Sequence, residues 1–230
     1  MMEINLTWYG RSAFLIEFDK YRVLLDPYFS GNSMAPIPWE AVTADLILVS
    51  HGHDDHVGDA LAIANRLDIP VLTNPEIGGW LGKHGLKKRI PIYISGIAEF
   101  PFGKVKSVIA MHGSSMEDGS YGGLAMGFIL YSSDGRKIYF AGDTGLFGDM
   151  RLIGEEQLDC ALLPIGDTYV MGLGESLRAI AMLSPRITIP MHFNPAMNIE
   201  NWQKEVRHHH SIPLVLEIGK RVLLSYSLFS

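Results

Sequence analysis

The segment His51-Gly52-His53-Asp54-Asp55-His56 constrains this chain more than any other feature of its sequence. It directly follows the apolar run Asp45–Ser50, which is typical of a strand covered on both faces. Imidazole nitrogens and carboxylate oxygens are good ligands for zinc and similar divalent ions. A solvated polar turn gains nothing from three imidazoles, so the segment predicts a metal site at the end of a buried strand.

The same short segment can address two metal ions. His51 and His53 are two residues apart, so in extended backbone they point to the same side. Asp55 and His56 lie where the chain turns into an expected helix and can face a second point nearby. Two ions about 3.5–4 Å apart suit hydrolysis, because they can share a hydroxide between them.

Three further candidate ligands follow predicted strands in the same way: His112 after Lys104–Met111, Asp143 after Arg136–Ala141 and His192 after Ile187–Met191. A lone histidine at a strand end is more often structural or solvated. Because all three residues are placed like the first cluster, a common site is the better interpretation.

Strands and helices are expected in both halves of the chain, in a similar order. The other expected strands are Ile4–Tyr9, Ser12–Phe18, Tyr21–Asp26, Ile69–Thr73, Leu124–Tyr131 and Cys160–Pro164, with a closing hairpin of Leu214–Glu217 and Arg221–Tyr226. The expected helices are Val57–Leu67, Glu76–His84, Leu173–Leu183 and Asn198–His208. No linker is visible, so the 230 residues indicate one domain, 1–230, of layered sheets with helices outside.

Composition excludes several classes of protein. The formal net charge is −6 and no long Lys/Arg block is present, so no nucleic-acid partner is expected. No window approaches the ~20 apolar residues of a spanning helix, and no signal peptide is recognisable, so a cytoplasmic protein without a membrane partner is expected. The single cysteine, Cys160, is expected to be a buried apolar residue, and no oligomeric state is predicted.

The H-x-H-x-D-H pattern of residues 51–56, with His112, Asp143 and His192 following in order, resembles the metallo-β-lactamase superfamily. The resemblance covers nearly the whole chain. The short length and the Asp26-Pro27-Tyr28 stretch look like a small branch of metal-dependent hydrolases related to ascorbate-6-phosphate lactonase. The resemblance implies an α+β fold, a four-layered αββα sandwich, with the metal site at one edge of the two sheets.

The resemblance also implies two sets of metal ligands joined by one carboxylate: His51, His53 and His112 for the first ion, Asp55, His56 and His192 for the second, and Asp143 for both. Asp26 matches a strand-end aspartate of the family that orients a ligand from behind. The implied cofactors are two divalent ions. Zinc is the first expectation, and the nitrogen and oxygen donors also suit manganese or iron.

The expected function is hydrolysis of an ester, lactone or phosphoester of a small molecule by a metal-bound hydroxide, with Asp55 as the catalytic residue that orients the nucleophile and handles its proton. Three alternatives stay open: a nuclease or phosphodiesterase acting on nucleic acid, an iron-dependent oxygenase, and a non-catalytic metal-binding protein. The acidic balance of the chain argues against the first, and the complete ligand set against the third.

Substrate-binding residues are less well determined by the sequence. Related chains often have Gly-His-Ser where this chain has Gly10-Arg11-Ser12. Arg11 is either a solvated loop residue or a fixed positive charge for an anionic substrate. Ser114 and Asp167 are weaker candidates, with a turn serine and a loop cap as the alternatives. Specificity is expected from three loops, Pro27–Trp39, Ser114–Gly123 and Gly166–Gly174.

Overall fold

The computed structural model describes residues 2–224 as two seven-stranded sheets that pack face to face. The first sheet contains β1 (Ile4–Trp8), β2 (Phe14–Phe18), β3 (Tyr21–Leu25), β4 (Leu46–Leu48), β5 (Val71–Thr73), β6 (Arg89–Pro91) and β14 (Arg221–Leu223). The second contains β7 (Ile97–Phe100), β8 (Gly103–Ile109), β9 (Met126–Ser132), β10 (Lys137–Phe140), β11 (Cys160–Pro164), β12 (Ile187–Met191) and β13 (Ile212–Pro213).

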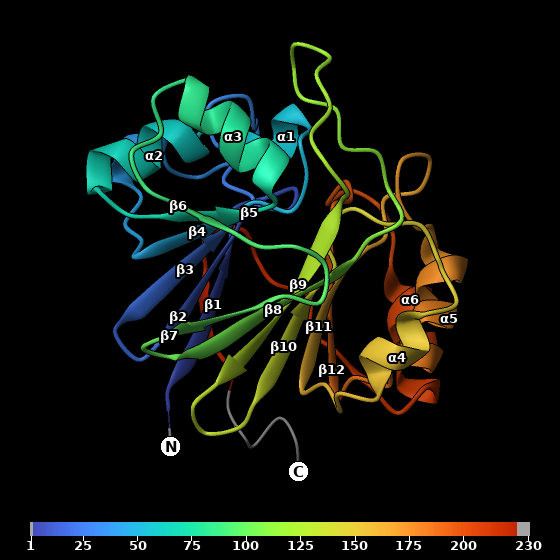
Figure 1. The fold of residues 1–230 in the computed structure, drawn as a ribbon. Helices are drawn as coiled ribbons and strands as arrows, with labels where there is room; N and C mark the ends of the chain where they lie inside the picture. Colours follow the sequence, from blue (N-terminus) through green and yellow to red (C-terminus); the bar gives the residue numbers. More distant parts are fainter. Residues whose placement is uncertain (1, 225–230) are drawn as a thin grey trace.

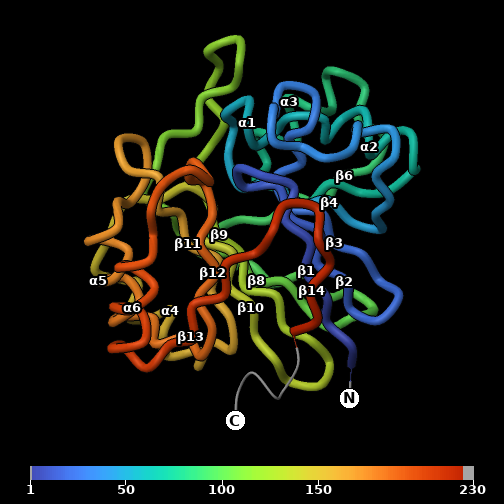
Figure 2. The backbone as a smooth tube through the Cα atoms, turned by 180° about the vertical axis from the view of Figure 1, so that it is seen from behind, coloured from blue at the N-terminus to red at the C-terminus, as the bar shows by residue number. Residues whose placement is uncertain are grey.

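Helices cover the outer face of each sheet (Figure 1). The first sheet carries α1 (Asp54–Val57), α2 (Ala60–Leu67) and α3 (Pro75–Lys83), together with a 3-10 turn, η1 (Trp39–Ala41). The second carries α4 (Met150–Gly154), α5 (Leu173–Leu183) and α6 (Glu200–His208). The view from behind shows the same two groups of helices on opposite sides of the strands (Figure 2). The expected α+β fold in αββα layers is therefore confirmed.

Alternation along the strands explains why the sheets stack. In β2, Phe14 and Ile16 face the core between the two sheets, whereas Leu15 faces the helices of the first sheet. In β4, Leu48 faces the inner core and Ile47 the helices. Successive side chains of a strand point to opposite faces, so a strand that is apolar throughout needs a cover on both sides.

Strand direction brings the ends of several strands to one edge of the sandwich. In the first sheet β3 and β4 are parallel, and in the second β10, β11 and β12 are parallel. β8 pairs antiparallel with β9, which pairs antiparallel with β10, so β8 runs in the same direction as β10. The carboxyl ends of β3, β4, β8, β10 and β12 are the places where the candidate ligands follow.

Two sequence predictions about the fold are wrong. The expected helix Val57–Leu67 is broken at Gly58, whose φ of +41° is left-handed and where a Cβ would lie 2.5 Å from the carbonyl oxygen of Pro27. The expected C-terminal hairpin does not form. Residues 221–223 instead pair antiparallel with β1, and residues 212–213 pair with β12. Ser225 and Tyr226 of that hairpin lie outside the described residues.

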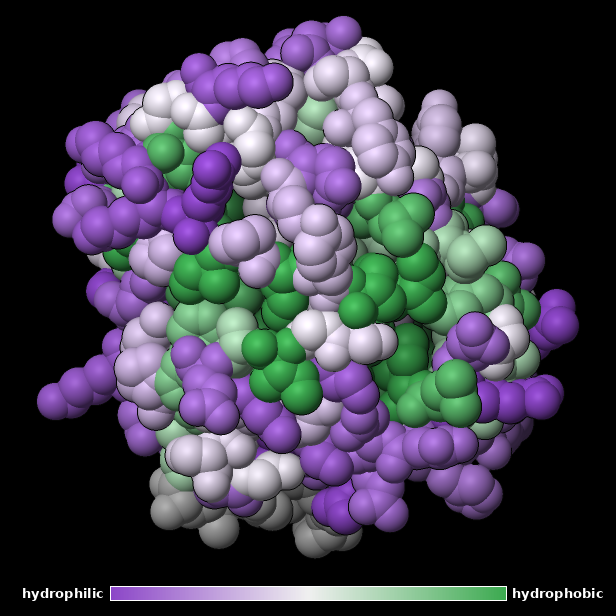
Figure 3. All heavy atoms as spheres, in the orientation of Figure 1, coloured by the Kyte–Doolittle hydropathy of each residue, from purple (hydrophilic) through white to green (hydrophobic). Residues whose placement is uncertain are grey.

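The surface is mixed in polarity. On the face seen in Figure 1, hydrophobic side chains gather across the middle, between hydrophilic regions (Figure 3). The exposed apolar residues include Ile97 on β7, Leu152 on α4, and Met111 and Leu124 beside the ends of β8 and β9. Cys160 is buried, as expected. No helix among residues 2–224 is long and apolar enough to cross a membrane.

Candidate metal centre

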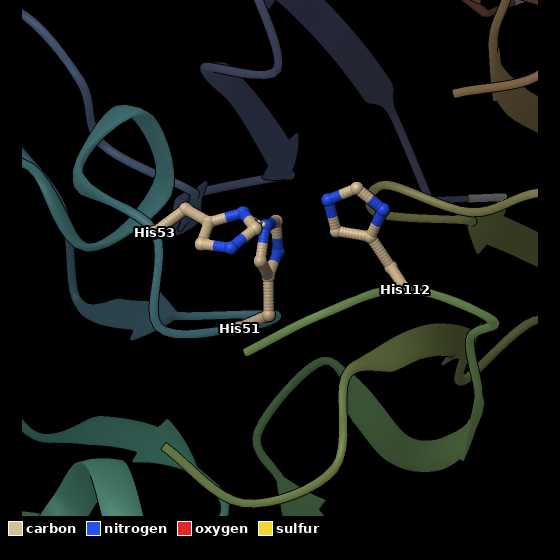
Figure 4. A group of neighbouring side chains, drawn as sticks. All are labelled: His51, His53 and His112. Carbon is tan, nitrogen blue, oxygen red and sulfur yellow. Dashed lines mark hydrogen bonds between the residues drawn. The ribbon is translucent and has the colours of Figure 1, made fainter. Parts of the chain in front are cut away.

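Three imidazoles form the first group at the edge of the sandwich. His51 and His53 come from the segment after β4, and His112 reaches toward them from the segment after β8 (Figure 4). Each offers one nitrogen, and these three atoms lie within 4.8 Å of one another. Nε2 of His51 and Nδ1 of His53 are 3.0 Å apart, and the rings stand nearly perpendicular to one another. This convergence of nitrogens is the arrangement that a metal ion requires.

A second group lies beside the first. Asp55, His56 and His192 also offer one ligand atom each within 4.8 Å of one another. The carboxylate of Asp55 places Oδ2 3.3 Å from Nε2 of His192, and Oδ1 3.7 Å from Nε2 of His56. His192 follows β12, so the second sheet completes a group that the first sheet begins.

The carboxylate of Asp143 joins the two groups. Its Oδ2 lies 3.2 Å from Nε2 of His192 and 3.3 Å from Nε2 of His56, both in the second group. The same oxygen lies 3.8 Å from Nε2 of His112, in the first group. Oδ2 of Asp143 is thus close to ligand atoms of both groups.

A buried network lies behind the imidazoles. Nδ1 of His56 is 2.6 Å from Oδ2 of Asp26, which also accepts a 2.6 Å hydrogen bond from the hydroxyl of Ser50. The backbone N–H of Ser50 donates to Oδ1 of Asp26 at 2.8 Å, and its hydroxyl lies 3.0 Å from Nδ1 of His51. Hydrogen bonds to the rear nitrogens leave Nε2 of His51 and His56 facing the centre.

The network contains one residue that sequence reasoning missed. Ser50, the last residue of the predicted strand, looks in the sequence like part of the apolar run, although its side chain connects Asp26 to His51. Its position directly before the first histidine is the signal that could have identified it, because a hydroxyl next to a ligand can bond the ring from behind. Asp26, a candidate from the resemblance, contacts Nδ1 of His56 in this structure.

The electrostatics of the site favour a bound cation. Burial lowers the pKa of His51 well below its usual value, and the neighbouring imidazoles add to this shift, so the ring is neutral and its lone pair is free. Burial would also lower the pKa of His56, but the carboxylates of Asp143 and Asp26 outweigh it and raise that pKa well above its usual value. The negative charges that favour a proton on Nε2 of His56 also favour a metal ion beside that atom.

Asp55 is ionised in this environment. Partial burial would raise the pKa of its carboxyl group. The hydrogen bond with His192 and the positive charges of His56 and Arg11 lower that pKa by more than burial raises it. The carboxylate therefore stays an acceptor at neutral pH.

Two buried atoms test whether the residues fit a metal. Among the described residues, Nε2 of His56 and Oδ1 of Asp143 are buried and have no hydrogen-bond partner. Buried polar atoms without a partner are costly unless something satisfies them. Both atoms belong to candidate ligands, and the set of donors is nitrogen and oxygen only, so the site fits divalent metal ions.

Gly52 allows a second loop to cover the metal segment. A Cβ at Gly52 would lie 2.9 Å from Sδ of Met116 and 3.0 Å from the carbonyl oxygen of Ser115. The backbone N–H of Gly52 donates to the hydroxyl of Ser114, which donates in turn to the carbonyl oxygen of Gly122. The hydroxyl of Ser114 thus braces this loop, and the geometry favours the structural alternative for that residue.

Arg11 and Asp167, the other substrate candidates, line one cleft of about 480 Å³. The wall of the cleft includes His192, so the cleft opens beside the second ligand group. Both residues are exposed, and the carboxylate of Asp167 accepts a hydrogen bond from the backbone N–H of Thr168. Among the three loops expected to give specificity, Pro27–Trp39 and Gly166–Gly174 both contribute to this cleft.

Comparison with known proteins identifies the family. The profile of the β-lactamase superfamily domain matches residues 21–193. The chain belongs to the metallo-β-lactamase superfamily. Within this superfamily it is 44% identical over 191 residues to a UPF0173 metal-dependent hydrolase of Thermus thermophilus, an alignment that covers 83% of this chain and 84% of that protein. The superfamily and the hydrolase class expected from the sequence are thereby confirmed.

Solved structures of the superfamily agree. Igni18, a metallo hydrolase from the archaeon Ignicoccus hospitalis, is 32% identical with a TM-score of 0.87, and the match covers 97% of this chain and 99% of that chain. The metallo-β-lactamase fold protein YhfI of Bacillus subtilis is 15% identical with a TM-score of 0.76, covering 97% of this chain and 100% of that one. The second likeness shows the fold alone.

Proposed function

We propose that this chain hydrolyses an ester, lactone or phosphoester of a small molecule, using two divalent metal ions of which zinc is the first expectation. The observation that carries the proposal is the position of Oδ2 of Asp143, 3.2 Å from His192 in one ligand group and 3.8 Å from His112 in the other. A carboxylate oxygen shared by two groups is suited to bridging two cations.

The proposed ligands follow from the two groups: His51, His53 and His112 for one ion, Asp55, His56 and His192 for the other, with Asp143 between them. When bound, such a pair of ions lowers the pKa of a shared water, so that hydroxide is available near neutral pH. Asp26 and Ser50 hold the rings of His56 and His51 in place from behind.

Asp55 is the proposed catalytic residue. Its carboxylate is about one-third exposed, whereas the side chains behind it are fully buried, so it borders both the ligand group and solvent. A carboxylate that stays ionised can accept a hydrogen bond from the attacking water, orient it and take its proton. An ester or phosphoester then gives an acid and a released alcohol, whereas a lactone gives a single hydroxy acid.

Metal analysis and a hydrolysis screen test the proposal. We expect elemental analysis by mass spectrometry to find two divalent ions per chain after reconstitution, and the loaded protein to hydrolyse members of a panel of esters, lactones and phosphoesters. RNA cleavage without ester hydrolysis would favour the nuclease alternative, and oxygen consumption with bound iron would favour the oxygenase. Bound metal without turnover on any of these substrates would favour a binding protein.

Asp55→Ala tests the catalytic assignment. We expect at least a hundredfold lower kcat for this variant, because a positioned acid–base group typically contributes 10²–10⁴-fold. The matched control is Asp54→Ala, whose side chain is exposed and adjacent in sequence, and it should remain within about threefold of the wild type. Circular dichroism checks the fold of both variants, and full activity in Asp55→Ala would contradict the assignment.

A further inference from the structure

The cleft beside His192 contains a single positively charged side chain. Arg11 is the only lysine or arginine in its lining, and its side chain has no hydrogen bond or ion pair with any other residue of the described range 2–224. Arg22, by contrast, is paired with Asp45. An arginine that is left unpaired in a cleft is available to a ligand.

The backbone of Arg11 is fixed to the metal centre. Its carbonyl oxygen accepts hydrogen bonds from the backbone N–H of His192, at 3.1 Å, and from Nε1 of Trp8, at 2.9 Å. Its φ of +51° is left-handed, a conformation that costs energy for a residue with a Cβ and persists only where surrounding contacts hold it. The Cα atom of Arg11 is therefore held at a constant distance from His192, a proposed metal ligand.

The remaining walls of the cleft suit a short organic chain. Met34, Phe193 and the exposed Tyr169 provide apolar surface in the same cleft as Arg11. Asp167 places a carboxylate on the same cleft, which disfavours a ligand that is anionic along its whole length. A ligand with one anionic end and an uncharged body fits both observations.

We propose that Arg11 is a specificity-determining residue, and that the substrate carries a carboxylate or phosphate group remote from the bond that is cleaved. The proposal rests on the hydrolase function proposed above. The guanidinium binds the anionic end in a bidentate manner, the apolar wall receives the chain, and the scissile group reaches the ligand groups beyond His192. Arg11 binds substrate without touching the reacting atoms.

Matched chromogenic esters test this proposal on the metal-loaded protein. The three substrates are the mono-4-nitrophenyl ester of glutaric acid, the 4-nitrophenyl ester of 4-phosphonobutyric acid, and neutral 4-nitrophenyl valerate. We expect at least one anionic ester to exceed the neutral ester in kcat/KM by tenfold or more, and the better of the two identifies the anionic group. Each is cleaved by water to an acid and 4-nitrophenol, so release of 4-nitrophenol reports on all three.

Arg11→Gln should lower kcat/KM for the preferred anionic ester by about ten- to a hundredfold, because a hydrogen-bonded charge contributes about 1.5–3 kcal/mol. The loss should lie in KM, and it should be at least tenfold larger than any loss on the valerate ester. Arg11→Lys should lower kcat/KM by an intermediate amount, since lysine keeps the positive charge but lacks the paired N–H donors of the guanidinium. Arg151→Gln, at an exposed position on α4, is the control that removes a positive charge elsewhere.

Three results would overturn the proposal: no preference for either anionic ester in the wild type, an equal loss on charged and neutral esters, or a loss confined to kcat. If the loaded wild type cleaves none of the esters, the proposed function fails on this panel, and the anion site is then tested by calorimetric titration with monomethyl glutarate. Binding that weakens tenfold or more in Arg11→Gln would support the site in that case, and equal or undetectable binding in both proteins would refute it.

Discussion

Behind the imidazoles, the side chains of Asp26 and His56 have no exposed surface, and Asp26, Ser50 and His56 are joined by hydrogen bonds of 2.6–2.8 Å. In front, Asp55 is about one-third exposed, and the exposed side chain of Arg11 has no hydrogen bond or ion pair among the described residues. The polar side-chain atoms of Asp26 and Ser50, the rear of the site, have hydrogen-bond partners within the protein, whereas Asp55 and Arg11, the front, have bonding capacity left over. The difference indicates that the rear determines how metals are held and the front determines what is bound and cleaved.

The largest effect is expected from the rear. Asp26→Ala should weaken metal binding by about 10- to 100-fold, because partners that orient ligands typically have this influence. It should also destabilise the metal-free protein by about 3–5 kcal/mol, since it leaves the buried charge of His56 with one partner fewer. Competition with a chelator measures the metal affinity, and urea denaturation measures the free energy of unfolding.

The control for that variant is Asp68→Ala, which removes an exposed carboxylate paired with Lys88 on the surface. Its metal affinity should equal that of the wild type. If Asp26→Ala behaves like Asp68→Ala, the distinction between the rear and the front of the site is refuted.

A pH dependence in the metal-free protein is the next effect in size. The pKa of His56 is raised in the folded state by Asp143 and Asp26, against the opposing effect of burial. The resulting stabilisation is complete below the pKa of an unfolded histidine, about 6.5, and is lost as pH rises through the folded pKa. Between these values the free energy of unfolding should fall by up to about 1.4 kcal/mol per pH unit.

Urea denaturation of chelator-treated protein between pH 6.5 and 9 measures this dependence. His56→Asn removes the titrating group, so its free energy of unfolding should decrease less steeply over the same range. If the free energy of unfolding depends on pH equally in the wild type and the variant, His56 does not hold a proton in the folded state. The contrast between the rear and the front of the site would then have no electrostatic basis.

The smallest effect is expected in front. Arg11→Gln and Tyr169→Ser should each change the free energy of unfolding by less than about 0.5 kcal/mol, because the side chain of Arg11 is exposed and makes no hydrogen bond or ion pair with residues 2–224, and Tyr169 is 77% exposed. Urea denaturation of the metal-free variants checks this. A loss above 1 kcal/mol in either variant would mean that the front, like the rear, supports the fold.

Much of the metal centre could be predicted from the sequence because its residues follow apolar strands. Parallel strands end at one edge, so His51, His112, Asp143 and His192 converge whenever the strands are assigned correctly. The predicted helix Leu173–Leu183 and the predicted strand Ile187–Met191 have the same bounds as the observed α5 and β12. These features depend on local pattern alone.

Features that depend on distant contacts were missed. The break at Gly58 lies against the carbonyl oxygen of Pro27, and no local pattern reveals that contact. β6 and β7 are short and partly exposed, so they lack the apolar alternation that identifies a strand. The side-chain role of Ser50 depends on Asp26 lying on the neighbouring strand.

The pairing of β14 with β1 has a consequence for the order of folding. Leu6 of β1 pairs with Val222, so almost the entire chain separates the two partners. A ribosome releases residues from the N-terminus onward, and loop closure between distant segments is slow. The outer edge of β1 therefore stays unpaired until residues 221–223 have been synthesised, and during that interval it is open to pairing with another nascent chain.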